Sequence, residues 1–297
     1  MDDDNPMVFR RAIAAFVCPQ GPEIIQQVIA TMGEIGYGGI DFGPAGKFVS
    51  SRQRPELQAI ARLAESCGLK RNATHYRDYG FDFLDDNASK ASFLLHAAED
   101  LEIAAQLGCE SVAFHVGAIE GASSRACLDA NAEVFAELAP LGKKLGLLLC
   151  LENHFRRPFG QTVPELLAIL EAVGSPALAV CVDTGHAVLV GLQSGEMIRQ
   201  AGSRLGMLHL CDNMGREDTH LAPGLGVVDW FSVFSALDEV GYEGPLNMEI
   251  GGHHPHDSFE PTARAGYHNL LQLLSEYYVI ANGRRKRQYD TDAAQDR

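Results

Sequence analysis

Short apolar runs alternate along the chain with longer segments in which apolar residues recur at helical spacing. The short runs lie at residues 11–18, 38–42, 69–74, 111–114, 147–151, 178–182, 205–210 and 246–250. Consecutive apolar positions, rather than alternating ones, are typical of strands that are buried on both faces, as in a parallel sheet. In the first periodic segment, Ile24, Val28, Met32 and Ile35 share one helical face. The pattern therefore predicts strands and helices in regular alternation.

The periodic segments predict helices at residues 24–35, 55–67, 89–107, 128–145, 163–173, 196–201, 229–240 and about 258–280. Gly68 and Gly108 stand where the second and third helices should end, and Thr162 is the expected N-cap of the fifth. Eight strand-helix units of roughly thirty residues each indicate an α/β protein with a single (β/α)8 TIM barrel. An open doubly wound sheet is the alternative. It is disfavoured because no G-x-G-x-x-G loop follows the first strand.

The length of 297 residues suits one such domain, since barrels of this kind typically need about 250 residues. From residue 283 onward a basic run, Arg284-Arg285-Lys286-Arg287, is followed by polar residues with no apolar period. We therefore expect a barrel domain at residues 1–282 and a disordered C-terminal tail at residues 283–297.

Composition narrows the range of partners. The chain has 24 basic and 39 acidic residues, a formal net charge of −15, which disfavours binding to nucleic acid. The sequence has no apolar run of the roughly 18 residues that a membrane span needs, and residues 1–6 do not resemble a signal peptide. Seven cysteines occur without a CxxC pair, which suits reduced thiols. We expect a cytoplasmic protein with no membrane partner.

Acidic residues and a histidine stand at the ends of the last four predicted strands. They are Glu152, Asp183, His209 and Glu249. In a barrel these ends meet on one rim, where three carboxylates would repel one another without a cation. An oxygen-rich set with one imidazole suits Mn²⁺, Mg²⁺ or Co²⁺ better than Zn²⁺. Asn247 should point inward with Glu249, where it would donate a hydrogen bond to a group that binds the metal.

These segments resemble the xylose-isomerase-like TIM barrels, which include sugar and sugar-phosphate isomerases and epimerases, inosose and dehydroshikimate dehydratases, and endonuclease IV. The matching segments are Leu151-Glu152-Asn153, Asp183-Thr184-Gly185-His186, His209-Leu210-Cys211-Asp212-Asn213, residues 218–230 with their G-x-G-x-x-D-W pattern, and Met248-Glu249. The resemblance covers nearly the whole chain. It is specific for the superfamily and does not name a substrate.

The resemblance implies that the four strand-end residues bind one divalent metal ion and that Glu152 and Glu249 also act as acid and base. It implies that His186 holds the substrate, and we assign the same role to His75, His115, Arg216 and His220. The expected reaction is isomerisation or epimerisation of a small sugar, cyclitol or sugar acid through an enediolate. A dehydratase on the same site shares the first step and stays open, as does a metal-binding protein without catalysis. The partner would be a small polyol or keto-sugar, and relatives often form homo-oligomers.

One departure concerns the residues after Glu152. Ketose 3-epimerases of this superfamily usually have a second Glu there, whereas this chain has His154, Phe155, Arg156 and Arg157. Such a departure weakens the case for a free-ketose epimerase. The two arginines are suited to a carboxylate or phosphate on the substrate, or to a solvated surface. For the cluster at residues 253–256 we expect a solvated loop, with a place on the rim of the site as the alternative.

Endonuclease IV offers a rival interpretation. His75, His115, His186, Asp218 and His220 occur where that enzyme has the additional ligands of a three-metal site. The match favours an abasic-site phosphodiesterase, in which clustered metals activate water. The net charge of −15 and the acidic loop at residues 82–86 disfavour it.

Overall fold

The computed structural model describes the backbone of residues 13–16, 24–70, 72–78, 80–251 and 259–295. Side chains are described over the same ranges except at residues 13–16, 282 and 284–295. The cluster at residues 253–256 lies outside the described residues.

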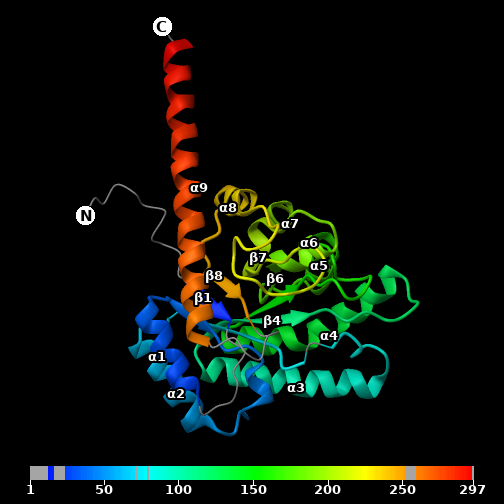
Figure 1. The fold of residues 1–297 in the computed structure, drawn as a ribbon. Coiled ribbons are helices and arrows are strands. Elements are labelled where there is room, and N and C mark those ends of the chain that lie inside the picture. Colours follow the sequence, from blue (N-terminus) through cyan, green and yellow to red (C-terminus); the bar gives the residue numbers. More distant parts are fainter. Residues whose placement is uncertain (1–12, 17–23, 71, 79, 252–258, 296–297) are drawn as a thin grey trace.

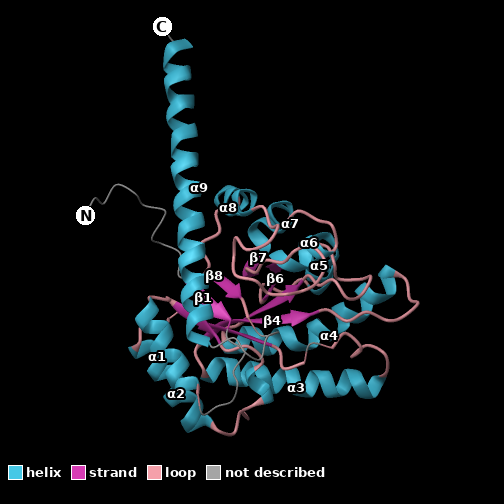
Figure 2. Ribbon diagram, viewed as in Figure 1, coloured by secondary structure: helices cyan, strands magenta, loops and turns pink. Residues whose placement is uncertain are grey.

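The strands pair in parallel to form a curled sheet at the centre of the molecule (Figure 2). They are β1 (Ile13–Phe16), β2 (Gly39–Asp41), β3 (Asn72–His75), β4 (Cys109–His115), β5 (Leu148–Glu152), β6 (Leu178–Asp183), β7 (Leu205–His209) and β8 (Leu246–Glu249). Their order is β7-β6-β5-β4-β3-β2-β1-β8. Just beyond β7, the Leu210 N–H donates to the Asn247 carbonyl at 2.8 Å, and the Leu210 carbonyl accepts from the Glu249 N–H at 3.1 Å. Backbone hydrogen bonds therefore also link the end of β7 to β8.

The helices lie outside this sheet (Figure 1). They are α1 (Ile25–Ile35), α2 (Arg54–Ser66), α3 (Asn87–Gln106), α4 (Ser124–Leu145), α5 (Val163–Val173), α6 (Thr184–Leu189), α7 (Ser194–Ala201), α8 (Trp230–Glu239) and α9 (Phe259–Gln295), with short 3₁₀ turns η1 (Ala45–Lys47) and η2 (Gly202–Arg204). Each predicted strand and helix has a counterpart, with bounds that differ by a few residues in most cases.

Two helices differ from the prediction. The sequence pattern gave no sign of α6, which begins directly after β6 because the Asp183 carboxylate accepts the His186 N–H at 2.6 Å and caps it. At the other end of the chain, α9 continues to Gln295 and projects away from the body (Figure 1). The expected boundary at residue 283 therefore falls inside a helix. Disorder of residues 283–297 stays a prediction.

The buried apolar side chains form two separate clusters. Large apolar side chains such as Phe114, Phe135 and Phe234 fill the layer between strands and helices. A separate cluster of mostly small residues forms a second group: Ala73, Ala113, Cys150, Ala179, Cys181 and Met207. These alternate along the strands with residues of the outer layer, which is the period of two that strands impose. The cysteines among the described residues are free thiols, as expected.

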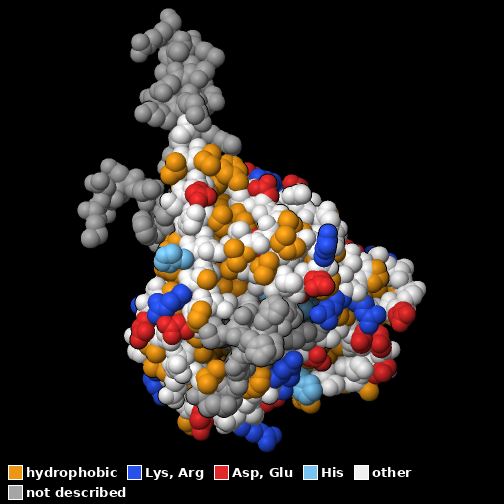
Figure 3. Space-filling model, viewed as in Figure 1, with side chains coloured by type: hydrophobic (Ala, Val, Ile, Leu, Met, Phe, Trp, Pro, Cys, Tyr) orange, Lys and Arg blue, Asp and Glu red, His pale blue; other side chains and the backbone are white. Residues whose placement is uncertain are grey.

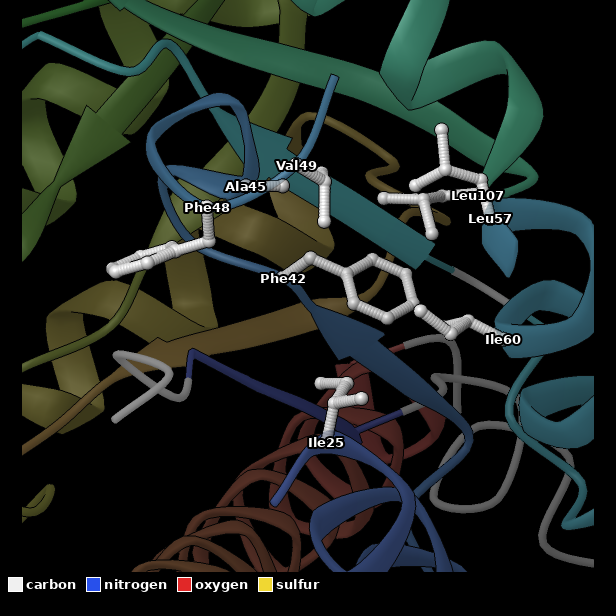
Figure 4. Close-up of a pocket in the computed structure, with 8 residues that line it drawn as sticks. All are labelled: Ile25, Phe42, Ala45, Phe48, Val49, Leu57, Ile60 and Leu107. Atoms are coloured by element: carbon white, nitrogen blue, oxygen red, sulfur yellow. The ribbon is translucent and has the colours of Figure 1, made fainter. Parts of the chain in front are cut away.

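The surface has a small apolar pocket and a mixed distribution of charge. A small pocket with entirely apolar walls lies by α1, α2 and the loop after β2 (Figure 4), lined by Ile25, Phe42, Ala45, Phe48, Val49, Leu57, Ile60 and Leu107. On the face seen in Figure 3, acidic and basic side chains are interspersed, and apolar side chains gather beside α9. None of the helices in the described ranges has the length and apolar character that crossing a bilayer requires.

Packing of α3 against the sheet gives a matched test of the fold. Leu101 is fully buried, whereas Leu95 on the same helix is 70% exposed. We predict that Leu101→Ala lowers the free energy of unfolding by about 2–5 kcal/mol, because it removes buried methyl groups and leaves a cavity. Leu95→Ala should change it by less than about 0.5 kcal/mol. Urea denaturation of both variants measures the difference, and equal effects would contradict this packing.

Candidate metal centre

Four polar side chains from adjacent strands meet at the carboxyl edge of the sheet. Glu152 ends β5, Asp183 ends β6, His209 ends β7 and Glu249 ends β8. Each offers one ligand atom, and these atoms all lie within 4.8 Å of one another. The register aligns Asp183 with His209 across β6 and β7. Glu152 is aligned with Cys181, two residues before Asp183, so the parallel strands deliver the four residues to one edge of the sheet with a stagger between β5 and β6.

The four side chains are buried. Asp183 and His209 are 0% exposed, Glu152 is 1% exposed and Glu249 is 6% exposed. Nδ1 of His209 lies 2.9 Å from Oε1 of Glu152 and 3.0 Å from Oε2 of Glu249. The imidazole therefore bridges two buried carboxylates.

Burial and charge act against each other at this centre. Burial would lower the pKa of His209, but Cys181, Glu152 and Glu249 together raise it well above its ordinary value. Burial would raise the pKa of Glu249, but His209 and His220 lower it to about 2. The pKa of Asp183 rises to about 6, mainly through burial, and Glu249 and Glu152 add to the rise. Without a cation, a proton on His209 is what balances the carboxylates.

This donor set fits a divalent cation. Three carboxylates and one imidazole are hard or borderline ligands, in the combination that suits Mn²⁺, Mg²⁺ or Co²⁺. A cation would supply the positive charge that the His209 proton supplies in its absence, and metal ligands must be deprotonated to bind.

Two more histidines face the other oxygen of Glu152. Nε2 of His75 lies 3.1 Å from Oε2 of Glu152, and Nε2 of His115 lies 3.4 Å from the same oxygen. Nδ1 of His75 lies 2.8 Å from the Tyr76 carbonyl, which can only accept, so this nitrogen carries a proton. His75, His115 and Glu152 form a second group of metal-type ligands.

A third group lies across the centre. Oδ2 of Asp218 is 3.4 Å from Nε2 of His186 and 3.1 Å from Nε2 of His220. Nδ1 of His186 donates to the Asn153 carbonyl at 2.9 Å, and Nδ1 of His220 donates to the Glu249 carbonyl at 3.0 Å. Backbone acceptors thus turn both Nε2 atoms toward one carboxylate.

The loop that carries Asp218 and His220 is held by one buried carboxylate. Asp212 accepts from the backbone N–H groups of Asn213, Gly224 and Val228 at 3.0–3.1 Å, and from Nε1 of Trp230 at 2.9 Å. A Cβ at Gly226 would lie 2.3 Å from Oδ1 of Asp212, so only glycine fits there. Residues of the G-x-G-x-x-D-W pattern therefore hydrogen-bond to Asp212, and this fixes the loop that carries Asp218 and His220.

Several predicted residues lie elsewhere or have other partners. Arg216 is exposed on the loop before Asp218, and its role in substrate binding stays a prediction. Arg157 pairs with Asp82. Arg156 lies 5.4 Å above the ring of Phe155, which is itself 5.1 Å from the ring of His186.

Sequence reasoning missed a further buried carboxylate. Asp41 ends β2 and is 0% exposed, with Oδ2 lying 3.9 Å from Nε2 of His209. Asn247 was expected to donate near the metal ligands, and its Nδ2 donates to Asp41 at 2.8 Å. The sequence did offer a clue to Asp41, because it is a polar residue at the end of a predicted strand, as are the four proposed metal ligands.

Comparison with known proteins gives partial matches. A protein of Methanocaldococcus jannaschii described as uncharacterized is 31% identical over 156 residues, which are 50% of this chain and 53% of that protein. A D-psicose 3-epimerase of Enterocloster bolteae is 30% identical over 115 residues, which are 38% of this chain and 36% of that enzyme. The matched segments thus span about half the length of these curated relatives, or less.

Solved structures match over a longer range. An L-ribulose 3-epimerase superposes with a TM-score of 0.76 over 92% of this chain and 97% of that one, at 19% identity, which shows a shared fold. The sequence profile of the xylose isomerase-like TIM barrels matches residues 29–274. The chain therefore belongs to the xylose isomerase-like TIM barrel family.

Proposed function

We propose that the protein is a divalent-metal-dependent isomerase or epimerase of a small sugar, cyclitol or sugar acid. The observation that carries the proposal is the buried set of three carboxylates and one imidazole, with all ligand atoms within 4.8 Å. Relatives of the chain that are D-psicose and L-ribulose 3-epimerases support the same class of reaction.

We further infer that the curled sheet is a closed (β/α)8 barrel within one domain at residues 1–282. The hydrogen bonds between Leu210 and β8 support closure, because they join the two ends of the strand order. Closure would bring the carboxyl ends of all strands onto one rim.

In the proposed centre, Glu152, Asp183, His209 and Glu249 hold the cation. When bound, the cation would polarise a substrate carbonyl and stabilise the enediolate that forms from it. Glu152 and Glu249 flank Nδ1 of His209 from two directions. At neutral pH both are ionised, since their neighbours lower their pKa values, so either can accept a proton.

The outcome depends on where the proton returns. One glutamate removes a proton from the substrate carbon, and the other, once it has taken up a proton from solvent, would deliver that proton to the opposite face of the same carbon. This inverts the carbon, which is epimerisation. Return to the neighbouring carbon gives an aldose-ketose isomerisation. Loss of a neighbouring hydroxyl group as water after the same first step is a dehydration. We keep a dehydratase as the alternative function of this site.

Substrate would lie beside the imidazoles above these carboxylates. His186 and His220 present Nε2 toward Asp218, while the half-buried Phe155 offers an apolar surface next to His186. Imidazoles suit hydroxyl groups, and an aromatic face suits the C–H face of a sugar. Arg156 at the rim would meet a charged substituent.

A second candidate function is an abasic-site phosphodiesterase of the endonuclease IV type. The observation that favours it is the pair of further ligand groups, His75, His115 and Glu152 on one side and His186, Asp218 and His220 on the other. Clustered cations would activate water and bind phosphate oxygens. The net charge of −15 opposes it, because DNA binding gains most of its free energy from neutralising phosphates.

Metal uptake should release protons. The raised pKa of His209 leaves it protonated at pH 7 in metal-free protein, so binding Mn²⁺ should displace about one proton. Calorimetric titration at pH 7 in two buffers of different ionisation enthalpy should give different binding enthalpies. The apparent affinity already falls with decreasing pH because His209 must lose its proton, and it should fall more steeply below about pH 6, where Asp183 also becomes protonated. His209→Gln should lose Mn²⁺ binding, whereas the control His96→Gln, on α3, should keep it. Equal binding enthalpies in both buffers for the unmodified protein would contradict the displacement of a proton from His209.

The acid and base roles are open to an exchange experiment. Glu152→Gln and Glu249→Gln should each slow solvent deuterium exchange into substrate by at least about 100-fold, because each removes one proton acceptor. A panel of ketoses, inososes and keto acids in D₂O, followed by NMR, provides the measurement. Glu196→Gln, which changes an exposed glutamate of α7, should exchange normally. Normal exchange by either site variant, with its metal content intact, would remove that residue from the mechanism.

Metal stoichiometry and DNA incision separate the two candidate functions. For the sugar enzyme we expect about one Mn²⁺, Mg²⁺ or Co²⁺ per chain, measured by plasma mass spectrometry on protein purified without chelators, and no incision of duplex DNA at an abasic site. About three Zn²⁺ per chain together with incision would favour the phosphodiesterase.

A further inference from the structure

A fully buried carboxylate lies behind the proposed metal ligand His209. Asp41 ends β2, and each of its oxygens has a fixed partner. Oδ1 accepts the backbone N–H of Gly43 at 2.8 Å, and Oδ2 accepts Nδ2 of Asn247 at 2.8 Å. The carboxylate is therefore held in one orientation by Gly43, in the loop after β2, and by Asn247 of β8.

The two ring nitrogens of His209 face different carboxylates. Nδ1 faces Glu152 and Glu249 at 2.9 and 3.0 Å. On the opposite edge of the ring, Nε2 lies 3.9 Å from Oδ2 of Asp41, which is within ion-pair distance and longer than a hydrogen bond. A histidine that binds a metal through one nitrogen commonly gives its other N–H to a carboxylate, which fixes the ring and makes the ligating nitrogen more basic.

Charge gives a reason for a carboxylate at this place. The hydrogen bonds to Asp41 come from neutral amides, and a buried anion served only by neutral donors is costly. Burial raises the pKa of Asp41, while the charge of His209 acts in the opposite direction. A positive charge on His209, or a cation bound to it, offsets the cost of burying Asp41.

Cys181 is another group close to His209, since its Sγ clusters with Glu152 and His209. A thiol is a weak acceptor and carries no charge. Asp41 therefore favours a proton on Nε2 more strongly than Cys181 does.

We propose that Asp41 is a positioning residue, whose charge favours the proton of His209 on Nε2 and so directs the Nδ1 lone pair into the metal centre. Gly43 and Asn247 fix Asp41 in turn. The inference rests on the metal-binding part of the proposed function and extends it to a layer of residues that touches neither metal nor substrate.

Asp41→Asn tests the role with almost no change in shape. Its amide would place an NH₂ group against either Gly43 or the Asn247 side, so one donor faces another whichever way it turns. We expect the dissociation constant for Co²⁺, measured by calorimetry, to rise about 10- to 100-fold, with a changed Co²⁺ absorption spectrum. Asp100→Asn is the matched control, because Asp100 is also buried but bonds Arg77 away from the centre, and it should bind Co²⁺ like the unmodified protein.

The outcomes are distinguishable. Unchanged Co²⁺ affinity in folded Asp41→Asn would overturn the inference while leaving the metal centre in place. Absence of Co²⁺, Mn²⁺ and Mg²⁺ binding by the unmodified protein would overturn the metal centre and this inference with it. If Asp41→Asn fails to fold, Asn247→Ala keeps the carboxylate and removes its side-chain donor; a several-fold weaker Co²⁺ affinity supports the positioning role, and an unchanged one contradicts it.

Discussion

The burial of three carboxylates at one point is the constraint on which the rest of the site depends. Glu152, Asp183 and Glu249 lie almost out of contact with water, where like charges repel strongly and the loss of hydration is costly. Positive charge has to be present at the same point. His209 supplies it as a bridging imidazolium in the metal-free protein, and a divalent cation would supply it more effectively.

The fold meets this constraint through strand geometry. Parallel strands end at the same edge, and alternate side chains share a face, so one polar residue at the end of each strand is enough to build the cluster. Small residues such as Ala179 and Cys150 occupy the level below it. The loops then add imidazoles whose orientation is fixed by backbone carbonyls and, after β7, by the Asp212 clamp. Rigid strands thus place the carboxylates, and braced loops place the groups around them.

Much of this arrangement could be predicted from sequence because it follows from local pattern. Apolar runs that end in Glu152, Asp183, His209 and Glu249 mark both the strands and the cluster. What could not be predicted depends on contacts between distant segments. The α6 helix forms because Asp183 serves as its cap as well as a site residue, and Asp41 shows its relation to His209 only when β2 and β7 are placed in space. Exposed residues such as Arg216 carry no pattern that fixes where they point.

The central claim is that the four strand-end residues hold one divalent cation, and crystallography of protein soaked with Mn²⁺ tests it most directly. An anomalous difference map should show a strong peak within about 2.0–2.3 Å of one carboxylate oxygen each from Glu152, Asp183 and Glu249 and of Nδ1 of His209. A map with no peak among these four residues, or with Mn²⁺ bound only elsewhere, would contradict the account.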